Sequence, residues 1–561
     1  MVLAGLPLLA SLVTSIALAQ SVPTIAPMIG KSHGAPRPLG AVTPQQTAPP
    51  AIPAPSIPQQ AAPSSLSEGP HFLLRGISVR GSTILTRKEV DQIAAPYLNR
   101  RIGTNELEEI RRLLTVAYIE KGYVNSGAVL PDQHVANGII VYQIIEGRLA
   151  DVAVTGTRHF SPGYFRRRLA RAATPPLDIN KLNREVRVLL QDPAIKQLNV
   201  DLRPGLKPGD ALLRADVVEN KPWDLSFTIA NDTPPSIGPI HGQVAGTYRN
   251  LLGLGDTISG SYGRTDGLND GSAAISVPVT AADTTLLAHY DRNDSIVIDD
   301  IFRTLDITSE TETIGAGIDQ PLYRTGDESL GVGFMLDYRS SRTFLLGQPF
   351  DLSPGSVDGR TKAFVLRLNQ NWLRRTAVDA IALRSTFSLG IATLGATNAA
   401  APPNANFRTW LGQLQYVRQI FKTQQLVFRA DIQLANAPLF SFEQIAIGGA
   451  GTVRGYRENT LVRDNAVILS LEDHIPVVHR RVLGVDSTLE VVPFGDYGKG
   501  RNSRGVTPEP RDIASLGIGL HAALGSRVQA KLDWGHGFTT IRYANEDLQD
   551  SGVHFQVTTL F

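Results

Sequence analysis

Residues 448–456 form a glycine-rich segment, Gly448-Gly449-Ala450-Gly451-Thr452-Val453-Arg454-Gly455-Tyr456. The sequence around it alternates between apolar and polar residues, which is typical of β-strands. An arginine between glycines indicates backbone that bends sharply and a charge that needs a partner. We expect that partner in a second segment, Phe494-Gly495-Asp496-Tyr497-Gly498, where an acid lies within a strand-like run. Together with the final alternating run 553–561, which ends in Phe561, the two segments predict an outer-membrane β-barrel with a charged loop folded into its lumen, Arg454 against Asp496.

The alternating region extends from residue 221 to residue 561 and predicts an all-β domain. Turns rich in Gly, Asp and Asn separate its runs, as in residues 266–271. Transmembrane strands need about 9–11 residues each, and about twenty residues per strand and connection give about sixteen strands. The last run, which holds Phe555, Val557 and Phe561, fits a final barrel strand. A soluble β-sandwich or propeller is the alternative, but no repeated blade motif accompanies the region.

Residues 71–220 have a different, α+β pattern that occurs twice. The first copy (71–149) predicts a strand over 72–80, a helix over 86–98, a helix from Thr104, and strands over 123–130 and 138–146. The second copy (150–220) repeats this order about 75 residues later, with a helix over 180–190 and strands over 198–202 and 211–218. We therefore predict two tandem β-α-α-β-β modules, each with its helices packed on one face of its sheet.

The N-terminal 70 residues predict no folded domain. Residues 1–19 are apolar and end Ala17-Leu18-Ala19, which favours a cleaved signal peptide over a membrane-spanning helix. Proline recurs through residues 20–70, so this segment is predicted to be a flexible tether. A Gly-x-Ser-x-Gly match at 30–34 lacks the flanking strand and helix that a catalytic serine needs.

Composition limits the possible functions. Charged residues are 19% of the 561 and the net charge is +2, so no basic field indicates nucleic acid. The absence of cysteine excludes disulfides, thiolate metal sites and cysteine nucleophiles. No histidine pair has a zinc-ligand spacing, and His474 and His479 are too loosely spaced to suggest zinc. We predict no catalytic residue, no metal and no cofactor.

Three motifs together indicate a family. Leu130-Pro131-Asp132-Gln133, followed by Glu146-Gly147-Arg148, is similar to the first periplasmic module of that family. The segments at 447–456 and 494–498 are similar to a pore-loop motif and its partner strand. With these motifs the chain resembles the two-partner secretion (TpsB-type) outer-membrane transporters of Gram-negative bacteria, the ShlB/FhaC/HecB family of the Omp85 superfamily. The resemblance covers residues 72–561.

The resemblance implies an architecture and an activity. Two POTRA modules would lie in the periplasm before a 16-stranded transmembrane β-barrel in the outer membrane. They would capture an unfolded exoprotein of the TpsA type, carrying an N-terminal secretion domain, and the barrel would export it. Haemolysins and adhesins are the substrates of such transporters. Because no Walker motif is present, export would proceed without ATP, and the protein would not be an enzyme.

The resemblance also assigns roles to residues of this sequence. The pore loop would carry Val453, Arg454, Gly455 and Tyr456, and the partner strand Phe494, Gly495, Asp496, Tyr497 and Gly498. The barrel-assembly machinery would recognise a C-terminal signal that contains Phe555, Val557 and Phe561, and outer-membrane lipid would surround the barrel.

The substrate site is predicted from strand chemistry. An exposed sheet edge offers unpaired N–H and C=O groups to which an extended chain can add as a further strand. Our candidate edge in the first module consists of Tyr123, Val124, Asn125, Ser126, Gly127, Ala128 and Val129.

Three other functions compete with secretion. An Omp85-type factor for assembly and insertion of outer-membrane proteins is the main alternative, although such factors usually carry three or five POTRA modules. A passive porin would leave the 150-residue modular region unexplained. An enzyme fused to a barrel lacks a credible nucleophile in this sequence.

Overall fold

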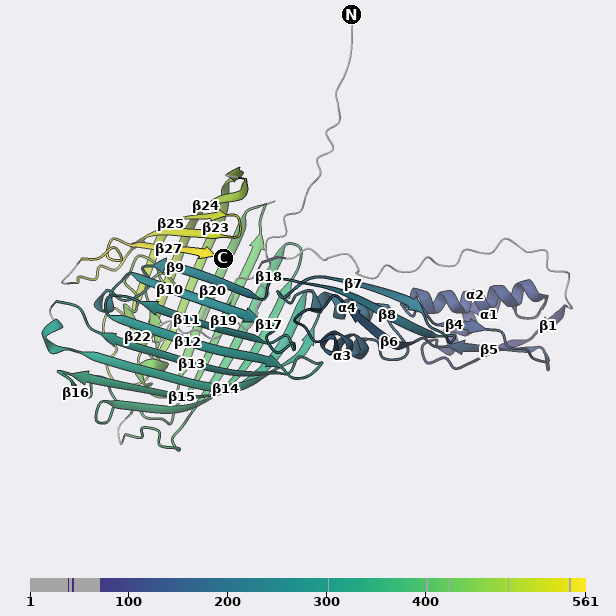
Figure 1. Cartoon of the computed structure of the whole chain (residues 1–561), viewed down its shortest axis with the longest axis horizontal. Coiled ribbons are helices and arrows are strands. Elements are labelled where there is room, and N and C mark those ends of the chain that lie inside the picture. Colours follow the sequence, from purple (N-terminus) through teal and green to yellow (C-terminus); the bar gives the residue numbers. More distant parts are fainter. Residues whose placement is uncertain are drawn as a thin grey trace, which may run out of the picture.

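The computed structural model describes residues 39, 43, 44, 71–300, 302–399, 402–421, 423–482, 484–543 and 546–561. The predicted signal peptide (1–19) and nearly all of the predicted tether lie outside these residues. The molecule is elongated, with a β-barrel at one end and two α+β modules in line beyond it (Figure 1). No helix within the described part of the chain combines the length and the apolar character needed to cross a bilayer.

The first module contains eight elements. They are β1 (Phe72–Leu74), β2 (Gly76–Arg80), α1 (Arg87–Ala94), η1 (Ala95–Tyr97), β3 (Arg100–Ile102), α2 (Thr104–Glu120), β4 (Gly127–Val129) and β5 (Ile139–Ile145). Its sheet has the order β2-β5-β4, with β2 and β5 parallel. Ile110, Leu114 and Tyr118 of α2 pack on Tyr142 of β5 in the core.

The second module has the same topology. Its elements are β6 (Arg148–Thr155), α3 (Pro162–Ala172), α4 (Ile179–Leu189), β7 (Ile195–Pro204) and β8 (Asp210–Glu219). The sheet order β6-β8-β7, with β6 parallel to β8, matches β2-β5-β4 of the first module strand for strand. The predicted tandem of β-α-α-β-β modules is thus confirmed.

Local predictions in the first module were wrong at three places. The strand over 72–80 is two strands, because the chain changes partner at Arg75: β1 pairs with β3 and β2 with β5. The helix from Thr86, whose side chain caps it as predicted, ends at Ala94 and not at Leu98, since Pro96 starts a 3₁₀ turn. Residues 123–126 form turns, held by the Tyr123 N–H on the Tyr118 carbonyl, so the strand begins only at Gly127.

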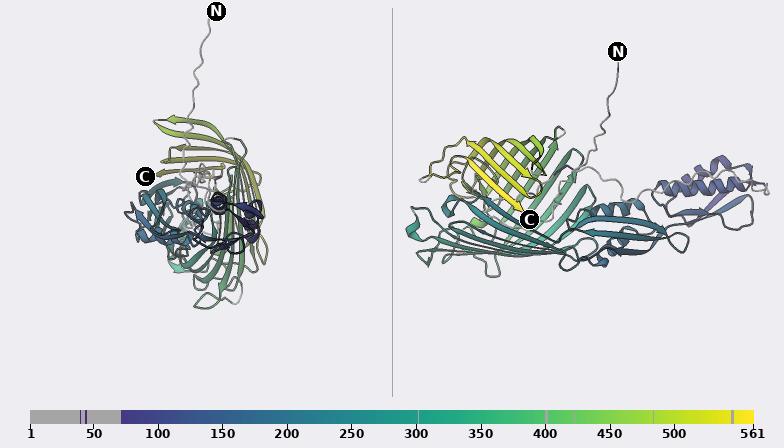
Figure 2. Two further views of the ribbon diagram at one scale, coloured as in Figure 1. Left: turned by 90° about the vertical axis from the view of Figure 1, so that its right-hand side faces the viewer. Right: turned by 45° about the horizontal axis from the view of Figure 1, so that its top comes forward.

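The barrel is closed and antiparallel and has sixteen strands, as predicted. They are β9 (Trp223–Ala230), β10 (His241–Arg249), β11 (Thr257–Arg264), β12 (Leu268–Pro278), β13 (Thr285–Ile296), β14 (Thr308–Arg324), β15 (Glu328–Leu345), β17 (Arg360–Arg375), β18 (Asp379–Ile391), β19 (Arg408–Gln419), β20 (Gln425–Ala435), β23 (Asn465–Val482), β24 (Val485–Arg501), β25 (Asp512–Leu524), β26 (Val528–Gly537) and β27 (Val553–Leu560). Four short elements accompany them, β16 (Gln348–Pro349), η2 (Pro235–Ile237), η3 (Arg303–Leu305) and η4 (Ser441–Glu443). Figure 2 shows the wall from two further directions.

Side chains along the barrel strands alternate between the outer and the inner face of the wall. On β9, Leu225, Phe227 and Ile229 are exposed on the outer face, and Leu516, Ile518 and Leu520 of β25 repeat the pattern. The residues between them point inward, and many are polar or small, as in transmembrane barrels. Closure occurs between β27 and β9 over five residue pairs, 556–560 with 226–230. Leu39, from the predicted tether, packs against Ala380 and Ala382 of β18.

Candidate pore-loop site

The connection between β20 and β23, residues 436–464, folds into the barrel and is called the inner loop. It contains η4 and a short hairpin of β21 (Ile445–Ile447) and β22 (Leu461–Arg463), with the motif 448–456 after β21. The residues of this hairpin that face the wall pack into one buried cluster: Ile445, Ile447, Val453, Tyr456 and Leu461 lie against Ala466, Ile468 and Ile513. The inner loop therefore contacts the wall formed by β23–β25.

Arg454 and Asp496 are brought together as the sequence predicts. The Arg454 Nε atom lies 2.8 Å from Asp496 Oδ2, and Nη2 lies 2.9 Å from Oδ1, so the guanidinium binds the carboxylate with two parallel hydrogen bonds. The backbone N–H of Arg454 also donates to Oδ2, at 3.1 Å. The Asp496 side chain is fully buried and that of Arg454 is 4% exposed. Two charges so deeply buried are stable only as a pair.

Arg454 has further partners that the sequence analysis did not identify. Its Nη1 atom lies 2.9 Å from Glu472 Oε1 on β23, and its guanidinium carbon lies 3.5 Å from the centre of the Phe494 ring. A cation over an aromatic face is attracted by the ring, more so where water is excluded. Phe494 thus contributes a face to the site, while Glu472 shares the positive charge with Asp496.

Gly455 and Tyr456 have separate structural roles. Gly455 has a φ of +89°, and a Cβ atom there would lie 2.8 Å from the Gly535 carbonyl oxygen on β26. Only glycine combines that conformation with that approach. The Tyr456 hydroxyl donates to the Ala514 carbonyl at 3.0 Å and accepts from the Thr539 N–H at 2.9 Å. The motif therefore contacts β24, β25 and β26.

The partner strand motif divides between the two faces of β24. Phe494, Asp496 and Gly498 point inward and are buried. A Cβ atom on Gly498 would lie 2.2 Å from Ile447 Cγ2, so glycine provides space for the hairpin of the inner loop. Gly495 and Tyr497 lie on the outer face and do not contact Arg454. Val453, before the arginine, is completely buried in the hairpin cluster.

The inner loop has a second ionic contact, which the sequence analysis missed. Glu443, at the end of η4, lies 2.7 Å from Arg339 Nη1 of β15 and 2.7 Å from Arg367 Nη2 of β17. Its side chain is 5% exposed. Phe440 and Phe442 pack beside it in a buried cluster with Phe407, Ala363 and Val365. An acid directly after Phe440 and Phe442 is the only local signal that could have indicated this contact.

The terminal strand lies where the sequence predicts. Phe555 and Val557 alternate with the buried, inward-facing His554 on β27, and Phe561 is 59% exposed at the chain end. The Phe561 N–H donates to the Leu225 carbonyl at 2.9 Å, which continues the seam with β9.

The seven residues predicted to bind substrate do not form one edge. Val124 packs on the core of the second module, and Asn125 Nδ2 donates to the Gly209 carbonyl at 2.9 Å, so this part joins the two modules. Ser126 is buried, so it offers no exposed sheet edge to a substrate. Only 127–129, as β4, lie at the edge of the sheet, with Val129 43% exposed.

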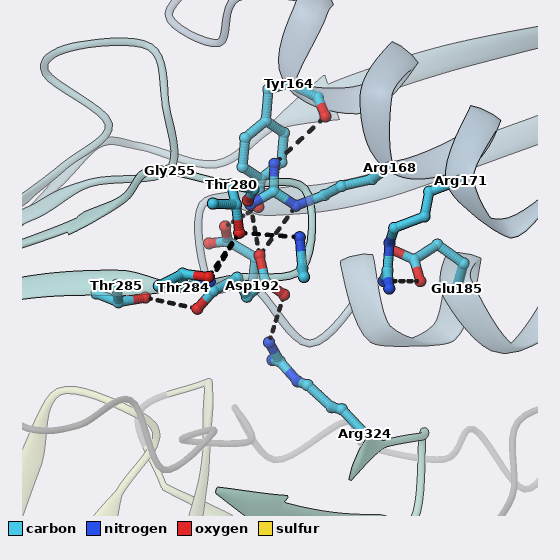
Figure 3. A network of polar contacts seen from close by, with 12 residues as sticks. Tyr164, Arg168, Arg171, Glu185, Asp192, Gly255, Thr280, Thr284, Thr285 and Arg324 are labelled. Atoms are coloured by element: carbon cyan, nitrogen blue, oxygen red, sulfur yellow. Dashed lines mark hydrogen bonds and ion pairs between the residues drawn. The ribbon is translucent and has the colours of Figure 1, made fainter. Parts of the chain in front are cut away.

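The second module is fixed to the barrel by a polar network (Figure 3). Arg168 of α3, whose side chain is 3% exposed, binds Asp283 Oδ1 in the turn between β12 and β13 with Nη2 at 2.5 Å and Nε at 3.0 Å. Arg324 at the end of β14 binds the same carboxylate at 3.2 Å. The Tyr164 ring covers the Arg168 guanidinium at 3.7 Å. Asp192 is also buried here, and this burial raises the pKa of its carboxyl. The network sets the direction of the module relative to the pore.

Comparisons with known proteins agree with this architecture. The family description "haemolysin secretion/activation protein ShlB/FhaC/HecB" matches residues 209–522, and the ShlB-type POTRA domain matches residues 72–147. The outer membrane transporter CdiB of Dickeya dadantii (strain 3937) is 24% identical over 413 residues, 70% of each chain. CdiB of Escherichia coli is 25% identical over 433 residues, 73% of this chain and 70% of that protein.

Solved structures share the fold. CdiB from Escherichia coli superposes with a TM-score of 0.68 at 21% identity, covering 91% of this chain and 94% of that one. BamA from Haemophilus ducreyi lacking POTRA domains 1-3 has a TM-score of 0.52 at 13% identity, covering 87% of this chain and all of that one. Since the family match extends over more than half of the 561 residues, the chain belongs to the ShlB/FhaC/HecB haemolysin secretion/activation proteins, outer-membrane transporters that secrete partner proteins and hold their POTRA modules in the periplasm.

Proposed function

We propose that this transporter captures an unfolded exoprotein through its POTRA modules and exports it through the barrel lumen without ATP. The observation that carries the proposal is the inner loop. It lies in the lumen and is held to the wall by side-chain contacts, which are the ion pairs of Arg454 with Asp496 and of Glu443 with Arg339 and the buried cluster of the hairpin. A loop attached in this way can be displaced without unfolding the barrel, because the strand ladders do not depend on it.

The modules supply a route to the lumen. Strand β4 lies at the edge of its sheet, where an extended chain can add by backbone hydrogen bonds, so residues 127–129 are the part of the predicted edge that we retain. The outward Ala128 N–H donates to Thr115 Oγ1 of α2 at 3.0 Å, so an incoming strand would have to displace this contact. The Arg168–Asp283 contact then holds the second module at the periplasmic turns of the barrel. Folding of the exported chain outside the cell would prevent its return, so no covalent chemistry by the transporter is required.

Deletion of the gene and complementation test the proposal. The deletion strain should lose one large protein from the medium and cell surface, and the wild-type gene should restore it. Arg454→Ala should reduce export, because Asp496 would be left buried without its partner. Arg457→Ala is the matched control: this nearby arginine pairs with Asp550 at 2.5 Å but outside the anchor, and export should persist.

Two results would contradict the proposal. Unchanged extracellular proteins in the deletion strain would exclude a secretion role. A general fall in the amounts of folded outer-membrane proteins would instead indicate an assembly and insertion factor.

A further inference from the structure

Two histidines and a glutamate meet on the inner wall near Arg454. His474 of β23, Glu490 of β24 and His521 of β25 each offer one ligand atom, and the three atoms lie within 4.8 Å of one another. His474 Nδ1 lies 3.0 Å from Glu490 Oε2, and Glu490 is directly opposite His521 in the strand register. We propose that these three residues form a binding site for a divalent transition-metal ion, with Zn²⁺ as the chemical match.

The donor set supports this assignment. Two imidazoles and one carboxylate are a known zinc set that leaves a coordination position open. Imidazole ligands favour zinc and its neighbours over calcium or magnesium, which prefer oxygen. The side chains are only partly buried, with His474 21% exposed, so an ion can reach them from the lumen.

Both histidines have the supporting carboxylates that metal-bound imidazoles usually have. The Nε2 atom of His474 lies 3.0 Å from Glu472 Oε2, and Nε2 of His521 lies 3.0 Å from Asp533 Oδ1. These contacts orient the rings and leave Nδ1 of His474 directed at Glu490. The carboxylate of Glu472, which binds Nε2 of His474, also makes Nδ1 of that ring a better ligand.

The charged side chains around the site carry a net negative charge that a cation can neutralise. The carboxylates around the site are Glu472, Glu490, Asp496 and Asp533, and the permanently positive side chains are Arg429, Arg454 and Lys531. The carboxylates exceed the cations by one. Either a proton on a histidine or a bound metal ion offsets this negative charge. The response of the Tm to pH and to Zn²⁺ distinguishes the two.

The site is coupled to the inner loop through one residue. Glu472 binds Arg454 with Oε1 at 2.9 Å and His474 with Oε2 at 3.0 Å. A bound ion would therefore fix the position of an acid that holds the loop. The sequence prediction of no metal relied on spacing along the chain, which is not informative when the ligands come from three neighbouring strands.

The test is a titration of the purified full chain with Zn²⁺ after chelation, without a polyhistidine tag. Calorimetry should show one equivalent bound by the wild type. His474→Ala and His521→Ala should abolish that binding. His479→Ala is the matched control, since His479 is exposed on the same strand outside the cluster, and it should bind as the wild type does.

Two near-isosteric variants keep the test decisive if an alanine variant fails to fold. Glu490→Gln should lose binding, and Asp533→Asn, which removes only a supporting carboxylate, should weaken it about 10- to 100-fold. Zn²⁺ should raise the Tm of the wild type and of His479→Ala. Equal Zn²⁺ affinity of the wild type and the His474→Ala/His521→Ala variant would overturn the proposal. So would a Tm that responds to pH but not to Zn²⁺, because a proton would then occupy the place assigned to the metal.

Discussion

Two of the ionic contacts that attach the inner loop to the wall have reversed charges. At one, the loop provides an arginine and the wall provides acids, Asp496 and Glu472. At the other, the loop provides an acid, Glu443, and the wall provides arginines, Arg339 and Arg367. We call these the Arg454 anchor and the Glu443 anchor. Reversed polarity prevents either loop charge from binding stably at the other site, so the two anchors fix the register of the loop in the lumen.

The anchors differ in what surrounds them. The Glu443 anchor lies in an aromatic cluster of Phe440, Phe442 and Phe407, so apolar burial adds to the ion pair. The Arg454 anchor lies in a glycine-rich turn and is flanked by Val453 and Tyr456, which are buried in the hairpin cluster, so it too has apolar support. Because Ala450 and Gly451, at the tip of this turn, are exposed, we expect residues 448–456 to detach first and the Glu443 anchor to retain the loop within the barrel.

Arg454→Ala should have the largest effect. It leaves the Asp496 carboxylate fully buried, with one backbone N–H as its remaining hydrogen-bond donor. Breaking a buried ion pair in this way should lower the free energy of unfolding by about 3–5 kcal/mol. Amide hydrogen exchange of residues 448–456 should accelerate accordingly, and pore conductance in planar bilayers should rise. Exchange in 439–447 should change little.

The double variant Arg454→Ala/Asp496→Ala is the control for this interpretation. Because it removes the orphaned charge as well, it should lose less stability than Arg454→Ala alone. Equal exchange at 448–456 in both variants would show that the ion pair does not hold the loop.

Glu443→Ala should have an intermediate effect. Arg367 retains Asp337 at 2.7 Å, and the aromatic cluster remains, so we expect a loss of about 1–3 kcal/mol. Exchange should accelerate in 439–447. If the anchors are independent, the effects of Glu443→Ala and Arg454→Ala add; an interaction energy of about 0.5–3 kcal/mol would show that the loop opens as one unit.

The same contrast explains how far the sequence could predict the site. The Arg454 anchor has a local signature on both sides, since glycines that permit close approach accompany each charged residue. The Glu443 anchor has none, because its arginines lie 104 and 76 residues earlier in the chain and nothing near them marks a loop contact. The sixteen strands and both modules were predictable, as their periodicity is a local property.

The predicted substrate-binding edge was too long because it included residues 123–126, which are not part of a strand. Their apolar and polar pattern resembles a strand, but Val124 is buried against the second module and Asn125 bonds to Gly209. A sequence pattern records burial without identifying the partner, so a contact between modules can resemble a strand within one module.

Arg457→Ala should have the smallest effect. It tests whether the burial of an ion pair determines how strongly its loss loosens the inner loop. Arg457 is only three residues from Arg454 and also has a carboxylate partner, Asp550 at 2.5 Å, and an aromatic one, Tyr543 at 3.9 Å. Its pair lies nearer to solvent, with side chains 12% and 20% exposed. We expect the loop to lose about 0.2–1 kcal/mol of stability, and this loss should decrease as salt is added. Amide hydrogen exchange of residues 448–456 measures it, as for Arg454→Ala. Acceleration as large as that of Arg454→Ala would mean that any charge lost from the loop releases it, and the distinction between the two anchors would then have no energetic basis.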